Sequence, residues 1–505
     1  MIASRRGVLA GSAALLGLAG RPQAQSGKIL RFGLQTTPPS LGPWEQVGTS
    51  ATTLNLCHRR GLLSYAPDGS LRAELAESWE SDGSTGWVFK LREAWFHNGK
   101  PVTSEDVRWT LEQIAEPRST AFFRTTMQGI ERIETPDGRT VRLILKEPSA
   151  VLPYWFAAPH MAICSRDAPA ASPRSVSAGP YVMDASERGT FYSFKPFDRF
   201  YRPGVPKLSE LRFIVYADEN LRVAALQAGD VDLIEYVPWQ SITMLDADSR
   251  FRQDKTDGPF MYLTFNARSG PLADARVRQA IAYAVNRDEV TKAAFFGHGA
   301  ALGGLPIASS SPFYDAGRAN HWRHDPARAK ALLAEAGAAD GFSLLLLSNI
   351  TNGMHKNTAE IVQQNLAQIG IQVQLSLPDW PTYVAQANRG QFDLAVNGTT
   401  GDNPDPDGLS SIIDCNLPAH FSRSQNLPVP ELTRLLARGR SELSLDRRKE
   451  IYAEVERLFL EQVTMVPLVA RTQAYAMRQG VSGFRNLAGQ LTFFSGVTLE
   501  DADIA

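Results

Sequence analysis

Strand and helix patterns alternate along the second half of the chain, and this alternation restricts the fold more than any other feature of the sequence. Strand patterns occur at residues 261–265, 344–347, 371–377 and 392–396. Helical patterns lie between them; one starts at Asp325-Pro326 and another stops at Gly370. Two strands that are separated by a helix in the sequence pair in parallel, and the chain crosses between them in a right-handed sense. The second half therefore predicts an α/β fold.

The first half predicts two antiparallel hairpins. One spans residues 78–91 and turns at Asp82-Gly83-Ser84, and the other joins residues 131–133 to 141–145 through a Pro-Asp-Gly turn. Between them, Thr103 and Asp106 have the spacing of a capping box at the start of a helix. Together, the two halves indicate a multidomain α/β protein.

The N-terminus has the pattern of an export signal. Arg5 and Arg6 precede an apolar run at residues 7–20, which is shorter than the ~20 apolar residues that span a bilayer. The paired arginines favour the twin-arginine type of signal, and we expect cleavage after Ala24. A lipoprotein would have cysteine where this chain has Arg21. We therefore expect residues 1–24 to be a signal peptide and the mature protein to be soluble in the periplasm, neither lipid-anchored nor membrane-spanning.

Charge and motif content exclude several classes of function. The net charge of −1 gives no electrostatic reason to bind nucleic acid or anionic lipid. Cys57, Cys164 and Cys415 are widely spaced and make neither a disulfide framework nor a zinc motif. Nucleophile-elbow, P-loop, zinc-protease and dinucleotide-binding motifs are absent. Because catalytic triads need not be local in sequence, a secreted peptide hydrolase remains an alternative.

Short segments that resemble one family occur in order along nearly the whole chain after the leader. They lie at residues 75–80, 96–101, 104–107, 178–181, 265–266, 274–281, 286–287, 325–337, 369–380, 392–407 and 421–423. Each is weak alone, but the ordered set is specific. It resembles the family 5 extracellular solute-binding proteins of ABC importers, the group that contains the dipeptide-, oligopeptide- and nickel-binding proteins.

The resemblance implies a fold and a division of the chain. It implies two α/β lobes joined by two chain crossings, with an extra subdomain inserted in the first lobe. The expected first lobe comprises residues 25–58, 162–264 and 475–505, the expected insert is 59–161, and the expected second lobe is 265–474.

The resemblance also implies a function. The protein would bind a short peptide or related amine-bearing solute between the lobes by hinge closure and deliver it to a membrane permease. We expect a monomer that performs no covalent chemistry and needs no cofactor or metal. Alternative ligands are an opine, a glutathione-like compound or a metal chelate.

The segment after the strand pattern at 392–396 contains the principal candidate site, Thr400-Gly401-Asp402. Ligands bind at the carboxyl ends of strands in open α/β sheets. In the dipeptide-binding relatives an aspartate in this loop receives the ammonium group, and Asp402 occupies its position. An ammonium group removed from water needs such a counter-charge. The alternative is that Asp402 only caps a turn.

Other candidates follow from the resemblance or from chemistry. Lys356 lies where the dipeptide binders have an arginine for the ligand carboxylate; a solvated surface lysine is the alternative. The aromatic side chains of Trp380, Trp44 and Tyr181 are candidates for packing against a ligand, with a place in the core as the alternative.

Two hypotheses of a metal site compete with the hypothesis of a ligand site. Asn403, Asp405, Asp407, Gly408 and Asp414 imitate a calcium loop, although prolines interrupt the pattern. The spacing of His321 and His324 is also compatible with a metal, although a helix-cap region is the expected reading. Finally, the second cysteine that some relatives pair near Cys415 is missing, so we expect no local disulfide there.

Overall fold

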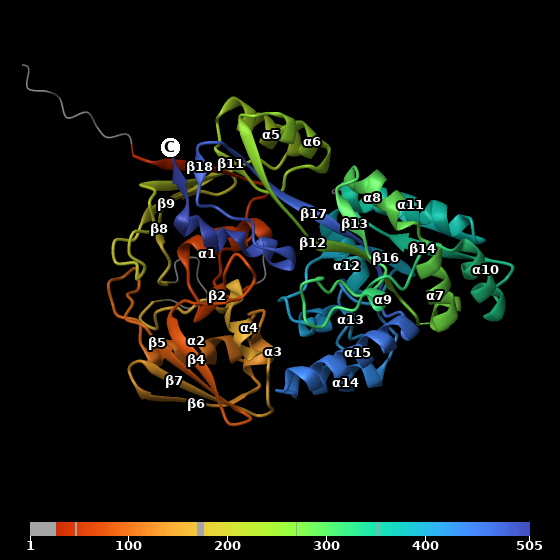
Figure 1. Cartoon of the computed structure of the whole chain (residues 1–505), viewed down its shortest axis with the longest axis horizontal. Helices are drawn as coiled ribbons and strands as arrows, with labels where there is room; N and C mark the ends of the chain where they lie inside the picture. Colours follow the sequence, from red (N-terminus) through yellow and green to blue (C-terminus); the bar gives the residue numbers. More distant parts are fainter. Residues whose placement is uncertain (1–26, 46–47, 169–175, 269, 351–352) are drawn as a thin grey trace, which may run out of the picture.

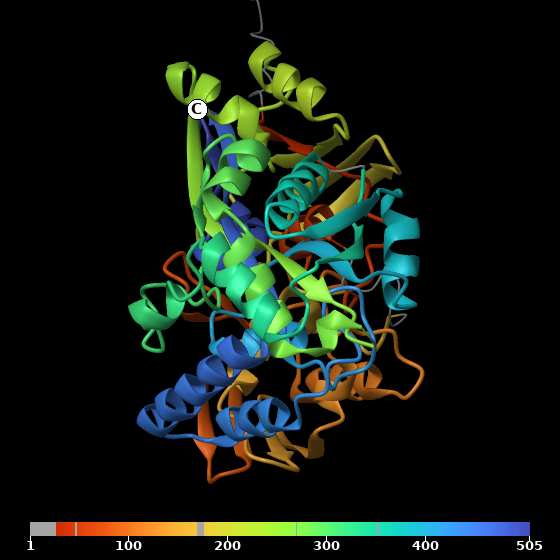
Figure 2. The same ribbon diagram turned by 90° about the vertical axis from the view of Figure 1, so that its right-hand side faces the viewer.

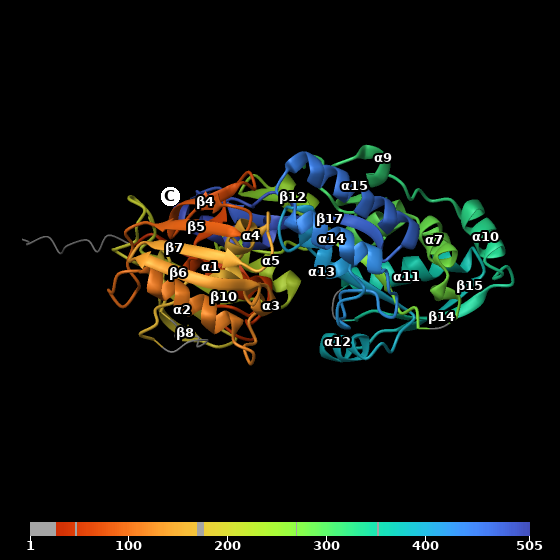
Figure 3. The same cartoon turned by 90° about the horizontal axis from the view of Figure 1, so that it is seen from below.

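Two long antiparallel strands join the two lobes of the protein. The computed structural model describes residues 27–45, 48–168, 176–268, 270–350 and 353–505, and the predicted signal peptide lies outside them. Strand β12 (Phe251–Phe265) pairs with β17 (Val466–Arg478) along its length. Figure 1 shows both strands running from one lobe to the other, and Figure 3 shows the lobes on either side of them. One sheet therefore extends through the molecule, in the order β15-β14-β16-β12-β17-β11-β1-β10-β9-β8.

The first lobe is built on one end of this sheet. Its strands are β1 (Ile29–Leu34), β8 (Tyr181–Glu187), β9 (Phe191–Pro196), β10 (Glu210–Val215) and β11 (Leu233–Ile234). Its helices are α1 (Thr49–His58), α5 (Glu219–Ala228) and α6 (Trp239–Ala247), joined by the 3-10 segment η4 (Gly489–Asp501) and the short strands β18 (Val481–Ser482) and β19 (Asp503–Ile504). The chain therefore returns to this lobe at its C-terminus.

A hairpin-rich subdomain extends from the first lobe. It contains β2 (Leu63–Tyr65), β3 (Leu71–Ala73), β4 (Ala76–Asp82), β5 (Gly86–Leu91), α2 (Ser104–Ala115), α3 (Arg124–Met127), β6 (Ile130–Asp137), β7 (Thr140–Leu145), α4 (Leu152–Phe156) and η1 (Pro159–Met161). The pairs β4–β5 and β6–β7 are antiparallel, which confirms both predicted hairpins. Thr103 and Asp106 form the predicted capping box of α2.

The second lobe contains the predicted strand–helix alternation. Its elements are η2 (Pro271–Ala273), α7 (Ala275–Ala284), α8 (Arg287–Phe295), β13 (Gly299–Ala301), α9 (Ala316–Ala319), α10 (Pro326–Glu335), β14 (Phe342–Leu347), α11 (Gly353–Ala367), β15 (Ile371–Ser376), α12 (Trp380–Asn388), β16 (Leu394–Thr399), η3 (Pro406–Leu409), α13 (Ser410–Ile413), α14 (Pro430–Ser441) and α15 (Leu445–Gln462). Strand β14 pairs in parallel with β15 and with β16, which confirms the parallel pairing for these three strands. The strand predicted at 261–265 is part of β12, which pairs antiparallel with β16. Asp325 caps α10 by accepting a hydrogen bond from the Arg328 N–H, as predicted.

The crossing strand β12 is longer than the predicted strand at 261–265, and its pairing is interrupted. Its register with β17 shifts between Asp257 and Phe260. Gly258 lies at the shift, where a Cβ atom would lie 2.0 Å from the backbone of Gly489. Only a glycine permits this approach of η4 to the crossing strand. The pairing of β12 is therefore irregular at the residues where the chain passes from one lobe to the other.

Helices α14 and α15 lie beside the hairpin subdomain, in the lower part of the molecule (Figure 2). The Ala150 N–H donates a hydrogen bond of 2.9 Å to the carbonyl of Arg440, near the end of α14. The guanidinium of Arg440 also lies 6.0 Å from the ring centroid of Trp155. The lobes therefore touch away from the crossing strands as well.

Candidate functional site

The segment after β16 forms a tightly held loop at the carboxyl end of its strand. The Asp402 N–H donates to the Gly408 carbonyl over 3.0 Å, which closes the loop on itself. Asn403 accepts a hydrogen bond from the Asp405 N–H, and Asp405 accepts one from the Asp407 N–H. These turns use short side chains to satisfy backbone donors, so the loop keeps one shape.

Two ion pairs with buried carboxylates fasten this loop to the helices behind it. The Asp405 carboxylate accepts two hydrogen bonds, of 2.7 and 2.8 Å, from the guanidinium of Arg448 on α15. Asp407 pairs with Arg440 on α14 at 3.0 Å. Because arginines hold these two carboxylates, the carboxylates are not arranged around a calcium ion. The calcium reading of this segment is therefore wrong.

Asp402 differs from these neighbours because it has no cation as a partner. Its carboxylate accepts a hydrogen bond of 3.0 Å from the Ser411 hydroxyl, and no lysine, arginine or histidine among the described residues forms an ion pair with it. Burial raises the pKa of Asp402 to about 6, helped by the negative charge of Asp407 and opposed by the Ser411 hydrogen bond and by Arg423. Asp402 thus has an ionisable carboxylate whose charge no cationic side chain of the described residues pairs with.

Side chains of the first lobe approach the same loop. A Cβ atom on Gly401 would lie 2.0 Å from the side-chain oxygen of Gln490, which belongs to η4. The Gln490 side-chain N–H donates in turn to the Pro306 carbonyl of the second lobe over 2.7 Å. Tyr65 of the hairpin subdomain also lies close enough to this loop to feel its charges. Burial raises the pKa of Tyr65, and the negative charges of Asp405 and Asp402 raise it further. The Asp402 loop therefore lies between the two lobes.

Aromatic rings line the first-lobe side of this region. Phe494 stacks on Tyr65 with ring centroids 6.1 Å apart. The preceding residue, Phe493, stacks on Tyr236 at 6.3 Å. Both phenylalanines keep part of their surface exposed. Such an aromatic wall beside one placed carboxylate is typical of a small-molecule site.

Several buried polar atoms around this region have no hydrogen-bond partner among the described residues. They are His355 Nδ1, Asn403 Nδ2, Arg423 Nε, Arg471 Nε and Gln490 Oε1. An unsatisfied buried polar atom costs about 1–3 kcal/mol, and proteins rarely leave several in one place without a functional reason. The polar groups of a bound solute would satisfy them.

Of the other predicted site residues, the structure brings Trp380 near the end of β16. Its ring stacks on Tyr383 with centroids 5.2 Å apart and lies 6.2 Å from the ring of His355. Trp380 is 37% exposed. Lys356 follows His355 on α11, and its ammonium lies 3.7 Å from the Glu360 carboxylate one turn along the helix. Trp380 thus lies beside His355 and Tyr383, whereas Lys356 is paired on the helix surface.

Trp44 and Tyr181 lie in cores. Trp44 is 3% exposed, packs against Trp109 and donates its indole N–H to the Ala162 carbonyl over 2.9 Å. Tyr181 is fully buried in the first lobe and donates its hydroxyl to the Leu499 carbonyl. The structure therefore places both in the core and does not bring them to the Asp402 loop.

The described residues contain neither a metal-binding cluster nor a helix that could span a membrane. His321 lies between the rings of Tyr283 and Trp322. In the described part of the chain no three histidine, cysteine or acidic side chains gather in a way that would hold a metal ion. No described helix combines the length and the apolar character needed to cross a bilayer. All three cysteines are buried, and no disulfide joins them.

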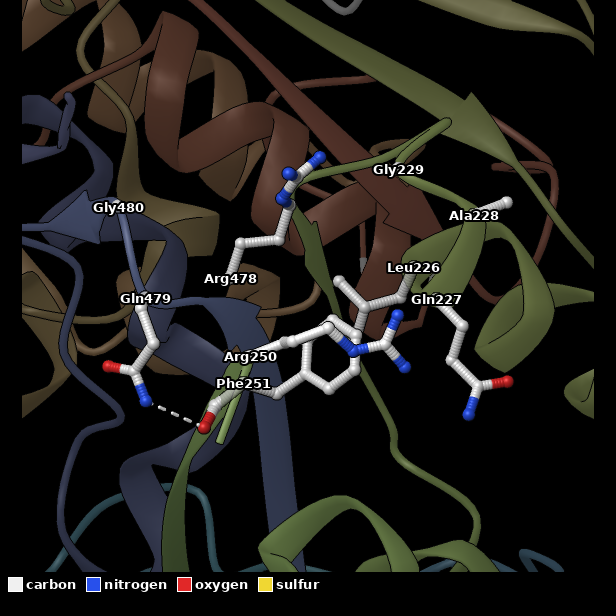
Figure 4. Close-up of a pocket in the computed structure, with 9 residues that line it drawn as sticks. All are labelled: Leu226, Gln227, Ala228, Gly229, Arg250, Phe251, Arg478, Gln479 and Gly480. Atoms are coloured by element: carbon white, nitrogen blue, oxygen red, sulfur yellow. Dashed lines mark hydrogen bonds between the residues drawn. The ribbon is translucent and has the colours of Figure 1, made fainter. Parts of the chain in front are cut away.

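A shallow pocket of about 320 Å³ lies elsewhere, on the first lobe (Figure 4). It is lined by Leu226, Gln227, Ala228, Gly229, Arg250, Phe251, Arg478, Gln479 and Gly480. Arg250 is paired with Asp248 at 2.6 Å, and Gln479 donates to the Phe251 carbonyl at 2.9 Å. None of the predicted site residues lines this pocket.

Sequence patterns contain little indication of the first-lobe residues that lie in this region. Tyr65, Gln490 and Phe493 lie hundreds of positions from the loop or in a C-terminal stretch without a motif. Arg471 had one detectable signal, since it is a charged residue within the apolar strand β17. A buried strand accepts an arginine only when that residue has a partner or a task.

The fold and the placement of the loop define a class. A single sheet crosses two lobes, and a partly buried carboxylate with an unused charge lies between them; this is the arrangement of a two-lobed solute-binding protein. A sequence profile of the bacterial extracellular solute-binding proteins, family 5 (Middle), matches residues 70–416. The chain belongs to this family, whose members are the substrate-binding components of ABC importers.

Individual relatives agree with this assignment. The glutathione-binding protein GsiB of Escherichia coli K12 is 26% identical over 92% of both chains. The periplasmic binding protein AgaA of A. tumefaciens R10, solved in complex with agropinic acid, is 38% identical, with a TM-score of 0.86 over 94% of this chain and 99% of that one. A dipeptide-binding protein of Pseudoalteromonas sp. SM9913, solved with Met-Leu, shares the fold at 20% identity, with a TM-score of 0.81 over 95% and 100% of the two chains.

Proposed function

We propose that this chain binds a small amine-bearing solute between its lobes, by contact with Asp402, and delivers it unchanged to a membrane permease. One observation carries the proposal: Asp402 is buried enough to raise its pKa to about 6, yet among the described residues only the Ser411 hydroxyl forms a hydrogen bond with its carboxylate. The buried loop around it satisfies its other acids with arginines. A cationic group of the solute would supply the missing charge.

Closure of the lobes is the proposed mechanism. The crossing strands change register between Asp257 and Phe260, so we place the hinge there and at Ala470, the residue that pairs with Phe260. A solute that touches Asp402 on one lobe and the wall of Tyr65 and Phe494 on the other stabilises the closed state by its contacts to both. We accordingly propose that the lobes divide at these crossing points, a few residues before the expected boundaries at 264/265 and 474/475.

The class of solute has two candidates. A short peptide, or a compound like the glutathione bound by GsiB, fits the charge of Asp402. An opine acid is favoured by the 38% identity to the protein solved with agropinic acid. From the N-terminal pattern and the family we also propose that the protein is exported to the periplasm. There it would act as a monomer that binds its solute without catalysis and without a cofactor.

Binding of defined probes tests the proposal. Thermal unfolding of the mature chain would be followed with Met-Leu, N-acetyl-Met-Leu, glutathione and agropinic acid, because a solute at 100 times its Kd adds about 2.7 kcal/mol to the free energy of unfolding. We expect stabilisation by amine-bearing probes that is lost on N-acetylation and in Asp402→Asn. Asp379→Asn, a helix-cap change on the same lobe, is the matched control and should bind normally. Binding that survives both N-acetylation and Asp402→Asn would contradict the role of Asp402.

A further inference from the structure

A second unpaired charge lies in the hinge. Arg471 of β17 is 2% exposed, and its guanidinium forms no ion pair with any acidic residue of the described chain. Its Nη1 donates a long hydrogen bond of 3.3 Å to the Gln473 side-chain oxygen, and its Nε has no hydrogen-bond partner in the part of the chain that the structure describes. A buried cation in this state is costly unless something else compensates its charge.

Three aromatic rings hold the guanidinium in place. Its central carbon lies 5.3 Å from the ring centroid of Tyr236, 5.6 Å from that of Trp239 and 6.0 Å from that of Phe493. Trp239 is itself fixed, because its indole N–H donates to the Thr472 carbonyl over 2.7 Å. Aromatic faces attract a guanidinium without neutralising it, so its N–H fork is oriented and remains available to an anion.

Strand register places Arg471 close to the Asp402 loop. Thr399 of β16 pairs with Phe260 of β12, and Phe260 pairs with Ala470 of β17. Both β16 and β17 are antiparallel to β12, so they run in the same direction. Thr400 follows Thr399 on one of them, and Arg471 follows Ala470 on the other. Two inter-strand spacings, about 10 Å, separate their backbones.

Neighbouring residues connect Arg471 to the same region. Phe493 stacks on Tyr236 beside Arg471, and the next residue, Phe494, stacks on Tyr65 beside the Asp402 loop. The positive charge of Arg471 also adds to burial in lowering the pKa of His355, whose ring lies near Trp380. Arg471 and Asp402 thus belong to one inter-lobe region.

We propose that Arg471 receives a carboxylate of the solute, and that the transported solute is therefore an acid that bridges Arg471 and Asp402. This inference rests on the proposed inter-lobe site and narrows its ligand to molecules that carry a carboxylate as well as a group for Asp402. The planar fork of Arg471 favours two parallel hydrogen bonds to one carboxylate. The competing explanation is that Arg471 only packs the hinge against its three aromatic neighbours.

Matched pairs of acids and amides separate these explanations. Isothermal titration at pH 7.5 would compare Met-Leu, glutathione and agropinic acid with the same compounds whose carboxylates are converted to carboxamides. For the wild type we expect each bound acid to exceed its amide in affinity by about 100-fold. In Arg471→Gln the acid/amide ratio should fall to about 3 or less, and Arg471→Lys, which keeps a point charge but not the fork, should lie between.

Arg278 supplies the matched control for a buried arginine. It is 1% exposed and donates to the carbonyls of Leu272, Ala273 and Gln462, within the second lobe. Arg278→Gln should lower stability but leave the acid/amide ratio unchanged. If Arg471→Gln does not fold, the wild-type ratio and Arg471→Lys decide the question.

The outcomes distinguish this inference from the proposed function. Amides that bind the wild type as well as acids do, or an acid/amide ratio that survives Arg471→Gln, would overturn the role of Arg471 while Asp402→Asn still reports on the amine site. Failure of every acid and every amide to bind would overturn both proposals together.

Discussion

The Cα atom of Gly401 faces the side-chain amide of Gln490 so closely that a Cβ atom there would lie 2.0 Å from the amide oxygen. The two residues belong to different lobes, and Gln490 also donates to the Pro306 carbonyl over 2.7 Å. The glycine at 401 thus allows the two lobes to meet at the candidate site.

Gly401→Ala should weaken ligand binding. Gln490 would have to turn away and would lose its hydrogen bond to Pro306, so closure should cost about 1 kcal/mol more, or roughly fivefold in Kd. Titration calorimetry with a bound acid measures this change. Gly138→Ala, at a turn where an added Cβ meets no atom within 4 Å, is the control and should bind as the wild type does. An unchanged Kd in Gly401→Ala would show that this contact does not form in the closed state.

The pH dependence of stability should report the unused charge of Asp402. Its pKa is raised to about 6, against an ordinary value of about 3.9, so between these pH values the folded chain holds more protons than the unfolded one. This residue therefore makes the ligand-free protein less stable as the pH rises from about 4 to 6. Asp402→Asn should be more stable than the wild type at pH 7 by about 1–3 kcal/mol and equal to it below pH ~4.

Chemical denaturation of both proteins across this pH range, without ligand, measures the difference. In the wild type the affinity for a cationic solute should rise with pH up to about 6, as the carboxylate ionises, whereas in Asp402→Asn it should stay flat. A pH-independent stability difference between the two proteins would mean that Asp402 titrates normally.

Loss of Arg448 should strongly destabilise the protein. Its guanidinium makes two hydrogen bonds to Asp405, and both side chains are buried, so Arg448→Met leaves an uncompensated carboxylate beneath the ligand loop. We expect a loss of about 3–5 kcal/mol in the free energy of unfolding, and part of it should return in the double variant with Asp405→Asn.

Arg457 provides the comparison on the same helix. It pairs with Glu461 at 2.7 Å, but their side chains are 63% and 51% exposed. Arg457→Met should cost no more than about 0.5 kcal/mol in denaturant unfolding. Equal effects of the two substitutions would contradict the structural role given to Asp405.

Trp155 should slow the reopening of the closed protein. Its ring lies 6.0 Å from the Arg440 guanidinium across the lobes, next to the hydrogen bond from Ala150 to the Arg440 carbonyl. Trp155→Leu should raise the rate of ligand dissociation about two- to fivefold, which corresponds to the loss of one exposed cation–π contact. Stopped-flow release of a bound acid gives this rate.

Trp95 forms the same kind of contact with Arg199 at 4.2 Å, within the first lobe and its subdomain. Trp95→Leu should therefore leave the dissociation rate unchanged. If both variants release ligand alike, the contact at Trp155 has no part in holding the lobes together.

Local patterns determined most of the secondary structure. The capping boxes and caps at Thr103 and Asp325 and the parallel pairing of β14 with β15 follow from residues close together in sequence, so they were predictable. The position of Asp402 after a buried strand was predictable for the same reason, because the end of a strand is a local feature. The length of β12 and the break in its pairing at Gly258 were not predictable, because η4, which packs there, comes from more than two hundred residues away.

Only the tertiary structure decided which side chains surround Asp402. Trp44 and Lys356 were candidates from residue type and family position. In the structure Trp44 lies in a core, and Lys356 forms an ion pair with Glu360. Arg471, Tyr236 and Phe493 come together because β17, the end of β11 and η4 meet at the hinge. The sequence by itself determined an α/β chain of the solute-binding family with an acidic loop at a strand end. Whether a charge is neutralised or left for a ligand depends on partners brought from distant segments, and no local pattern contains that information.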